Sequence, residues 1–125
     1  MSALGDIMEQ AGPPCLPSSA VEILKAGRAK IVKGWTQGIY ARDIYGDKIA
    51  DSYPGAVSWC AYGAVHGACN GWAPYAVVRY LIRALPEGWE SVSDYNDDTE
   101  RTQSDILRLY DNAITIAKSE VGCKL

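Results

Sequence analysis

The sequence predicts a mainly α-helical (α+β) domain, a compact bundle of four to five helices with one small β-hairpin. Apolar residues recur at helical spacing in several segments, and capping residues, glycine or proline delimit those segments. A β-rich stretch interrupted by a glycine predicts the hairpin. The chain has 125 residues, 48% of them hydrophobic, which is enough to bury one core. A single globular domain over residues 18–125 is expected, preceded by a proline-rich, flexible N-terminal arm over residues 1–17.

The first helix is expected to begin at Ser19 and to end at about Lys33. Ser19 and Glu22 have the spacing of a capping box, and Gly34 follows the last turn as a stop. The hairpin should follow, with strands over residues 39–42 and 48–50 around a glycine turn. An isolated hairpin is marginally stable, so its aromatic side chains are expected to lean on the helices.

Two further helices are expected in the middle of the chain. One begins at Cys60 and ends near Asn70, and the small residues Gly63 and Gly67 on one of its faces predict the close approach of another helix. The next begins around Pro74, because proline is tolerated in a first turn, and carries one apolar stripe as far as residue 85.

The last helix has the clearest pattern in the chain. Thr102 and Asp105 have cap-like spacing at its start. The apolar residues that follow obey the i, i+3, i+4, i+7 rule, and they are Ile106, Leu109, Tyr110, Ala113, Ile114 and Ala117. An amphipathic helix packed on the core is therefore expected.

Charge and hydropathy exclude several classes of function. The net charge is −3, and six acidic residues between Glu87 and Glu100 are balanced by no Lys or Arg. Binding to nucleic acid or to an anionic membrane surface requires a cationic field, so neither is expected. The sequence shows no secretory signal and no run of roughly 20 apolar residues, which predicts a cytoplasmic protein.

Neither a metal site nor a cofactor is predicted. The four cysteines are scattered without a Cys-x-x-Cys pair, and the chain has one histidine. Asp94, Asn96 and Asp98 fall in an EF-hand-like register, but Thr99 stands where the tight turn needs glycine. The acidic segment is therefore expected either to cap the last helix or to form a contact surface for a basic partner.

Several short motifs resemble a known family. They are Gly34-Trp35-Thr36-Gln37-Gly38 with Tyr40-Ala41-Arg42-Asp43, then Trp59-Cys60-Ala61-Tyr62-Gly63-Ala64, and finally Asn96-Asp97 with Arg101-Thr102. Over about residues 20–118 they resemble a family of small uncharacterised proteins of bacteria and their phages, a domain of unknown function. The resemblance implies no activity and no site residue. Tyr95 departs from the pattern, where tryptophan is expected.

Cys60 is the candidate nucleophile. A cysteine after a tryptophan at the start of a helix is similar to the nucleophile of papain-like and cell-wall amidase folds, because the helix N-terminus favours the thiolate. The mechanism also needs a base, and His66 lies six residues along the same predicted helix, pointing away. Asn96 or Asp97 could orient a base. A cysteine-dependent hydrolase or transferase using Cys60 is therefore kept as an alternative.

The leading hypothesis is a small, non-catalytic binding module that engages a protein partner. The resemblance to phage proteins favours a host protein, and a homodimer is left open. Aromatic side chains with polar tips and an acidic rim are typical of interfaces. The candidate binding residues are Trp35, Tyr40, Trp59, Tyr62, Asp94, Asn96, Asp97 and Asp98. A small-molecule pocket lined by the four aromatic residues is a further alternative.

Overall fold

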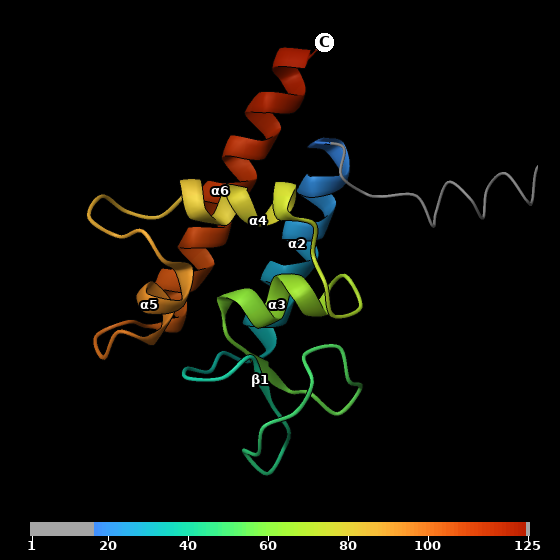
Figure 1. Cartoon of the computed structure of the whole chain (residues 1–125), viewed down its shortest axis with the longest axis vertical. Helices are drawn as coiled ribbons and strands as arrows, with labels where there is room; N and C mark the ends of the chain where they lie inside the picture. Colours follow the sequence, from blue (N-terminus) through green and yellow to red (C-terminus); the bar gives the residue numbers. More distant parts are fainter. Residues whose placement is uncertain (1–16, 125) are drawn as a thin grey trace, which may run out of the picture.

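The computed structural model describes residues 17–124, and the side chains of residues 20–120. Within this range, helices and two short strands follow one another as the fold class predicts (Figure 1). They are α2 (Pro17–Lys33), β1 (Ala41–Arg42), β2 (Ser58–Trp59), α3 (Ala61–Gly67), α4 (Tyr75–Arg83), α5 (Val92–Asp97) and α6 (Gln103–Lys124). Apart from Pro17, the expected flexible arm lies outside the described residues.

Helices α2 and α6 pack against each other and form the centre of the core. Leu24 and Ile31 of α2 and Ile106 and Tyr110 of α6 are fully buried. A Cβ atom at Gly27 would lie 2.9 Å from a ring carbon of Tyr110, so glycine at this position lets the two helices approach closely. The amphipathic pattern of the last helix therefore predicts its buried face correctly.

The capping residues of the two long helices behave differently. Thr102 and Asp105 form a reciprocal capping box at the start of α6: each backbone N–H donates to the other's side chain, at 3.0 Å and 3.2 Å. Helix α2 already contains Pro17, so it begins before Ser19. The prediction that Ser19 caps this helix is wrong.

The first strand of the expected hairpin, β1, pairs with a later segment of the chain than expected. Strand β1 is antiparallel to β2, with Ala41 opposite Trp59. The predicted turn is present, because Gly46 has a φ of 85° and donates its N–H to the Asp43 carbonyl at 2.9 Å. Lys48 contributes only an isolated bridge to the pair. Burial of Trp59 accounts for the difference, since its ring is 4% exposed and anchors β2 in the core.

The acidic segment contains a helix that the sequence pattern did not predict. Ser91 caps α5 by accepting a hydrogen bond from the Asp94 N–H at 3.1 Å, and Val92 and Tyr95 bury one side of the helix. One and a half turns give too few residues for a periodic signal. The acidic segment is therefore partly helical.

Glycines on α3 contact extended backbone rather than another helix. A Cβ atom at Gly63 would overlap the carbonyl oxygen of Tyr40, and one at Gly67 would lie 2.5 Å from the carbonyl oxygen of Asp51. The expected close approach occurs, but the partner on this face is the chain on either side of the hairpin turn. Gly63 and Gly67 thus place Tyr40 and Asp51 one helical turn apart over α3.

Candidate functional site

Asn96 is the centre of a buried hydrogen-bond network that joins three segments. Its side chain is 1% exposed. The Oδ1 atom accepts hydrogen bonds from the Trp35 indole N–H at 2.8 Å and from the Ala61 backbone N–H at 3.0 Å. The Nδ2 atom donates to the Thr36 carbonyl at 3.2 Å and to Asp97 Oδ1 at 2.9 Å. The side-chain oxygen of Asn96 accepts two hydrogen bonds and its NH₂ group donates two, so the hydrogen-bonding capacity of the amide is fully used and its role is structural.

The loop around Gln37 is bound to α5 by further hydrogen bonds. Gln37 Nε2 donates to the carbonyls of Asn96 and Asp98 at 2.9 Å and 2.8 Å, and the Gly38 N–H donates to Asp97 Oδ1 at 2.9 Å. Beyond α5, Arg101 donates to the Tyr95 carbonyl at 2.7 Å and stacks on the Tyr95 ring at 3.7 Å. The sequence motifs that resemble a family therefore form one assembly around α5.

Cys60, Asn96 and Asp97, the candidate catalytic residues, line one small hollow of about 160 Å³ together with Tyr40 and Tyr62. Cys60 precedes α3 as its N-cap, and its Sγ accepts a hydrogen bond from the Gly63 N–H at 3.3 Å. The sequence prediction of a thiol at a helix N-terminus is confirmed. The hollow is also where the two tyrosines of the binding prediction meet these residues.

The surroundings of Cys60 do not activate the thiol. Burial raises its pKa, and the nearby carboxylates of Asp97 and Asp51 raise it further, against the lowering effect of backbone N–H groups. His66 is occupied elsewhere, because its Nδ1 accepts the Ala73 N–H at 2.8 Å. Among the side chains that line the hollow there is no histidine. This geometry favours Cys60 as a buried cap over Cys60 as a nucleophile.

Two of the predicted binding aromatics are held inside the fold. Trp59 is buried, its indole N–H donates to the Asp51 carbonyl at 2.9 Å, and the Lys30 ammonium lies 4.7 Å from its ring centre. Trp35 is half-buried and donates to Asn96. Their rings position backbone segments, whereas Tyr40 and Tyr62 reach the surface.

A group of rings that we call the aromatic face surrounds a second hollow, of about 210 Å³. It consists of Tyr40, Tyr62, His66, Trp72 and Tyr75. Tyr40, Trp72 and Tyr75 are 51%, 76% and 67% exposed. The His66 ring lies 5.7–6.2 Å from the rings of Trp72, Tyr62 and Tyr40, centre to centre. These residues come from the loop before β1, from α3, from the α3–α4 loop and from the first turn of α4.

Sequence reasoning missed Trp72, Tyr75 and the place of His66 in this group. The signal lies in the segment Gly71-Trp72-Ala73-Pro74-Tyr75, where aromatic residues surround a turn. Gly71 has a φ of 105°, and Pro74 is the N-cap of α4. Aromatic residues on both sides of a helix start cannot all face the core, which is the clue to their exposure.

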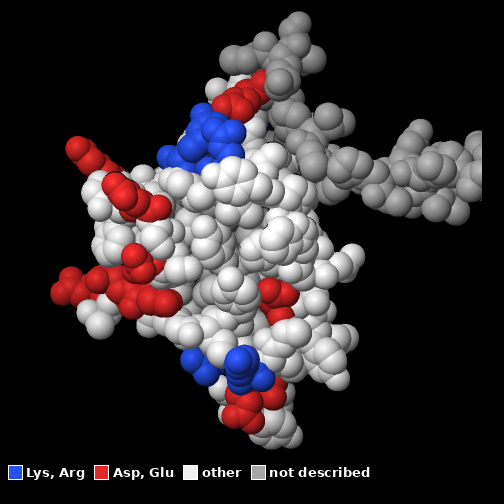
Figure 2. Space-filling view, in the orientation of Figure 1, with Lys and Arg blue, Asp and Glu red and all other residues white. Residues whose placement is uncertain are grey.

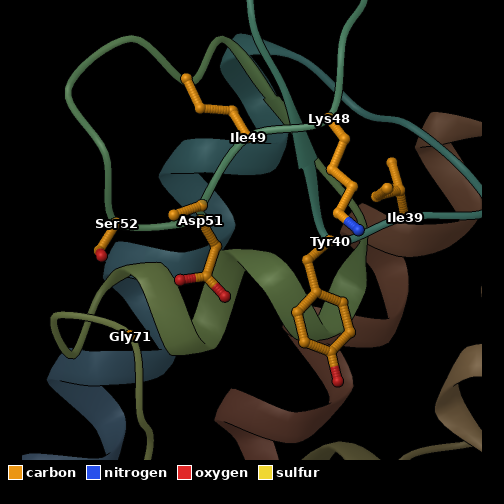
Figure 3. Close-up of a pocket in the computed structure, with 8 residues that line it drawn as sticks. Ile39, Tyr40, Lys48, Ile49, Asp51, Ser52 and Gly71 are labelled. Carbon is orange, nitrogen blue, oxygen red and sulfur yellow. The ribbon is translucent and has the colours of Figure 1, made fainter.

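A wider, open cleft of about 790 Å³ lies on the other side of Tyr40. Figure 3 shows the side chains of Tyr40 and Asp51 pointing toward α3 from their separate segments, whereas Ile49 points away from α3 and Lys48 extends toward Tyr40 and Ile39. Asp51 is 8% exposed, and burial raises the pKa of its carboxyl group, partly offset by the charges of His66 and Lys30. Tyr40 thus lines this cleft as well as the two smaller hollows.

Charged side chains are unevenly distributed over the surface. Figure 2 shows acidic side chains gathered over α5 and the loops beside it and basic side chains above them, whereas the middle of the same face carries few charges. Asp94 and Asp97 are exposed and Asp98 is half-buried. Asp98 lies 3.6 Å from the Arg101 guanidinium. These three acidic residues of the binding prediction thus form a rim beside α3, and none of them lines the hollow of the aromatic face.

Two properties of the described residues restrict the type of site. Every helix within residues 17–124 is too short or too polar to cross a bilayer. In the same part of the chain, no three His, Cys, Asp or Glu side chains are grouped so that they could hold a metal ion.

The comparison with known families identifies the chain. A family model described as "Family of unknown function (DUF6197)" matches residues 16–116. No curated protein and no solved structure matches. The matched range contains the Asn96 network, the Cys60 hollow and the whole aromatic face. Because this range is most of the 125 residues, the chain belongs to the family of unknown function DUF6197.

Proposed function

We propose that the protein is a non-catalytic binding module that engages a protein partner through the aromatic face. The observation that carries the proposal is the exposure of Trp72 and Tyr75, at 76% and 67%, beside a hollow of about 210 Å³. Exposed apolar patches with polar rims mark interaction sites in soluble proteins, and Trp and Tyr supply much of the binding energy. Neither ring belongs to the buried core, and the Trp72 ring packs on the His66 ring at the surface.

The acidic rim over α5 supports a partner with a basic surface. Asp94 and Asp97 belong to α5 and Asp98 ends it, and Asp97 lines the smaller hollow together with Tyr40 and Tyr62. Charges at the rim of an interface mainly accelerate association. Within this proposal the module acts in the cytoplasm. The resemblance to phage proteins favours a host protein as the partner.

The two alternatives have weaker support. A small ligand could occupy the hollow between Cys60, Tyr40 and Tyr62, but its volume of about 160 Å³ is below the roughly 300–1,000 Å³ of most ligand pockets. A cysteine-dependent hydrolase or transferase would need a thiol with a lowered pKa, and burial raises the pKa of Cys60.

Partner recovery from an extract of the native cells tests the proposal. The tagged full chain is compared with a variant that carries Trp72→Ala and Tyr75→Ala. The matched control carries Ile44→Ala and Tyr45→Ala, which remove two side chains of the hairpin turn that are 72% and 82% exposed. Bound proteins are quantified by mass spectrometry, and circular dichroism verifies the fold of each variant.

We expect the unmodified chain and the control to recover the same protein. The Trp72/Tyr75 variant should recover at least about tenfold less, because hot-spot aromatics contribute about 2 kcal/mol or more each. Equal recovery by this variant would overturn the proposal. Sedimentation equilibrium of the three chains addresses the homodimer: self-association that only the Trp72/Tyr75 variant abolishes would identify a second copy as the partner.

A further inference from the structure

Three rings of the aromatic face lie around His66 at shallow angles to its plane, and the Trp72 ring stacks on it. The His66 ring is inclined by 25° to the Trp72 ring, by 39° to the Tyr62 ring and by 34° to the Tyr40 ring. Tyr75 completes the lining of the hollow. The π-face of an aromatic ring carries partial negative charge, so a hollow lined by several aromatic rings favours a cationic group.

The hollow itself contributes no positive charge. Its lining includes neither Lys nor Arg. Burial lowers the pKa of His66 against the raising effect of the Asp51 carboxylate, and its Nδ1 accepts the Ala73 N–H, which favours the neutral imidazole. Elsewhere in the described chain, aromatic rings have cations of their own: Lys30 lies over Trp59, and Arg101 lies over Tyr95. No such pair within residues 20–120 involves a ring of the aromatic face.

The size and lining of the hollow restrict the cation that fits. About 210 Å³ is too small for a drug-sized ligand but accommodates the head of one side chain. An unmodified ammonium group needs acceptors for three N–H donors, and no carboxylate lines the hollow. A methylated ammonium group needs fewer acceptors and places its methyl groups against the rings.

We propose that this hollow binds the methylated ammonium head of a lysine side chain on the protein partner. The inference rests on the proposed function and specifies the chemistry that the aromatic face recognises. The net charge of −3 and the acidic rim over α5 favour a cationic segment on the partner.

A titration with side-chain analogues tests the inference. The probe is N-acetyl-Nε-trimethyllysine methylamide, added to the full-length protein and followed by the proton resonance of its N-methyl groups. Aromatic rings shift this resonance upfield when the group lies over their faces. Comparison ligands are the neutral isostere with carbon in place of the quaternary nitrogen, the unmethylated lysine analogue, and choline.

We expect the trimethyllysine analogue to bind roughly tenfold more tightly than the neutral isostere and to show the upfield shift. Trp72→Leu together with Tyr75→Leu should weaken binding at least about tenfold, whereas Tyr45→Leu should leave it unchanged. Equal affinity for the neutral isostere or for unmethylated lysine would overturn the inference. Tighter binding of choline than of the trimethyllysine analogue would also overturn it, in favour of a free small molecule.

The two proposals fail in different ways. If the Trp72/Tyr75 variant loses the partner but no analogue prefers the methylated ammonium, the inference is wrong and the proposed function stands. If that variant keeps the partner, the proposed function is wrong, and so is the inference that a methylated lysine of the partner binds in this hollow.

Discussion

Replacing Asn96 by alanine should destabilise the fold strongly, because this amide serves buried groups of three segments. The Ala61 N–H is fully buried and would lose its acceptor, which costs about 1–3 kcal/mol. The Trp35 indole N–H is only half-buried, so water can replace part of that hydrogen bond. Together with the lost packing of the side chain, we expect a decrease of about 2–4 kcal/mol in the free energy of unfolding.

Urea unfolding, followed by tryptophan fluorescence and circular dichroism, measures this loss. Asn112→Ala is the matched control, because Asn112 is exposed on α6 and its substitution should change stability by less than about 0.5 kcal/mol. Trp35→Phe removes the indole N–H together with part of the ring, and should cost about 1–3 kcal/mol in the free energy of unfolding. Because Asn96 and Trp35 share a hydrogen bond, the double variant should lose less than the sum of the single losses. A loss below about 0.5 kcal/mol for Asn96→Ala would refute the structural role of the network.

Three shorter predictions concern α3. Gly63→Ala should lower the free energy of unfolding by about 2 kcal/mol, because the clash with the Tyr40 backbone outweighs the higher helix propensity of alanine. Gly55→Ala, whose added Cβ would make ordinary contacts near 3.4 Å, should be tolerated. Thermal unfolding of both variants tests this difference. Cys60 should resist iodoacetamide at pH 7 until the chain unfolds, because burial raises its pKa, and rapid alkylation below pH 7 would restore the enzyme hypothesis. The pKa of His66 is lowered in the folded state, so below about pH 6.5 the unfolded chain binds the extra proton and stability falls as the pH drops. His66→Gln should reduce this slope between pH 7 and 5.5, and an unchanged slope would show that His66 does not cause it.

The sequence predicted those elements whose signals are local. The long apolar repeat identified α6, and the Thr102–Asp105 spacing identified its capping box, because each depends on residues three or four positions apart. The thiol at the start of α3 was also recognisable, since capping positions follow from where a helix begins. Helix α5 was missed because its two buried apolar side chains, Val92 and Tyr95, are too few to make a periodic pattern.

The site could not be predicted because it depends on contacts between distant segments. Asn96 caps α3 and holds Trp35 across some 60 positions of sequence. Its neighbours in the chain are acidic, which favoured a surface role. The exposure of Trp72 likewise follows from the geometry of the α3–α4 turn, which no helical or strand periodicity predicts.

A photoreactive phenylalanine analogue placed at position 75 tests the central claim most directly, that the aromatic face is the binding surface. Tyr75 is 67% exposed at the edge of the hollow, so the analogue can be introduced without disturbing the core. The same analogue at position 45, in the hairpin turn, is the control. Crosslinking to one partner protein in the native cells from position 75 and not from position 45 is the predicted result. Equal crosslinking from both positions, or crosslinking only from position 45, would contradict the assignment of the binding surface.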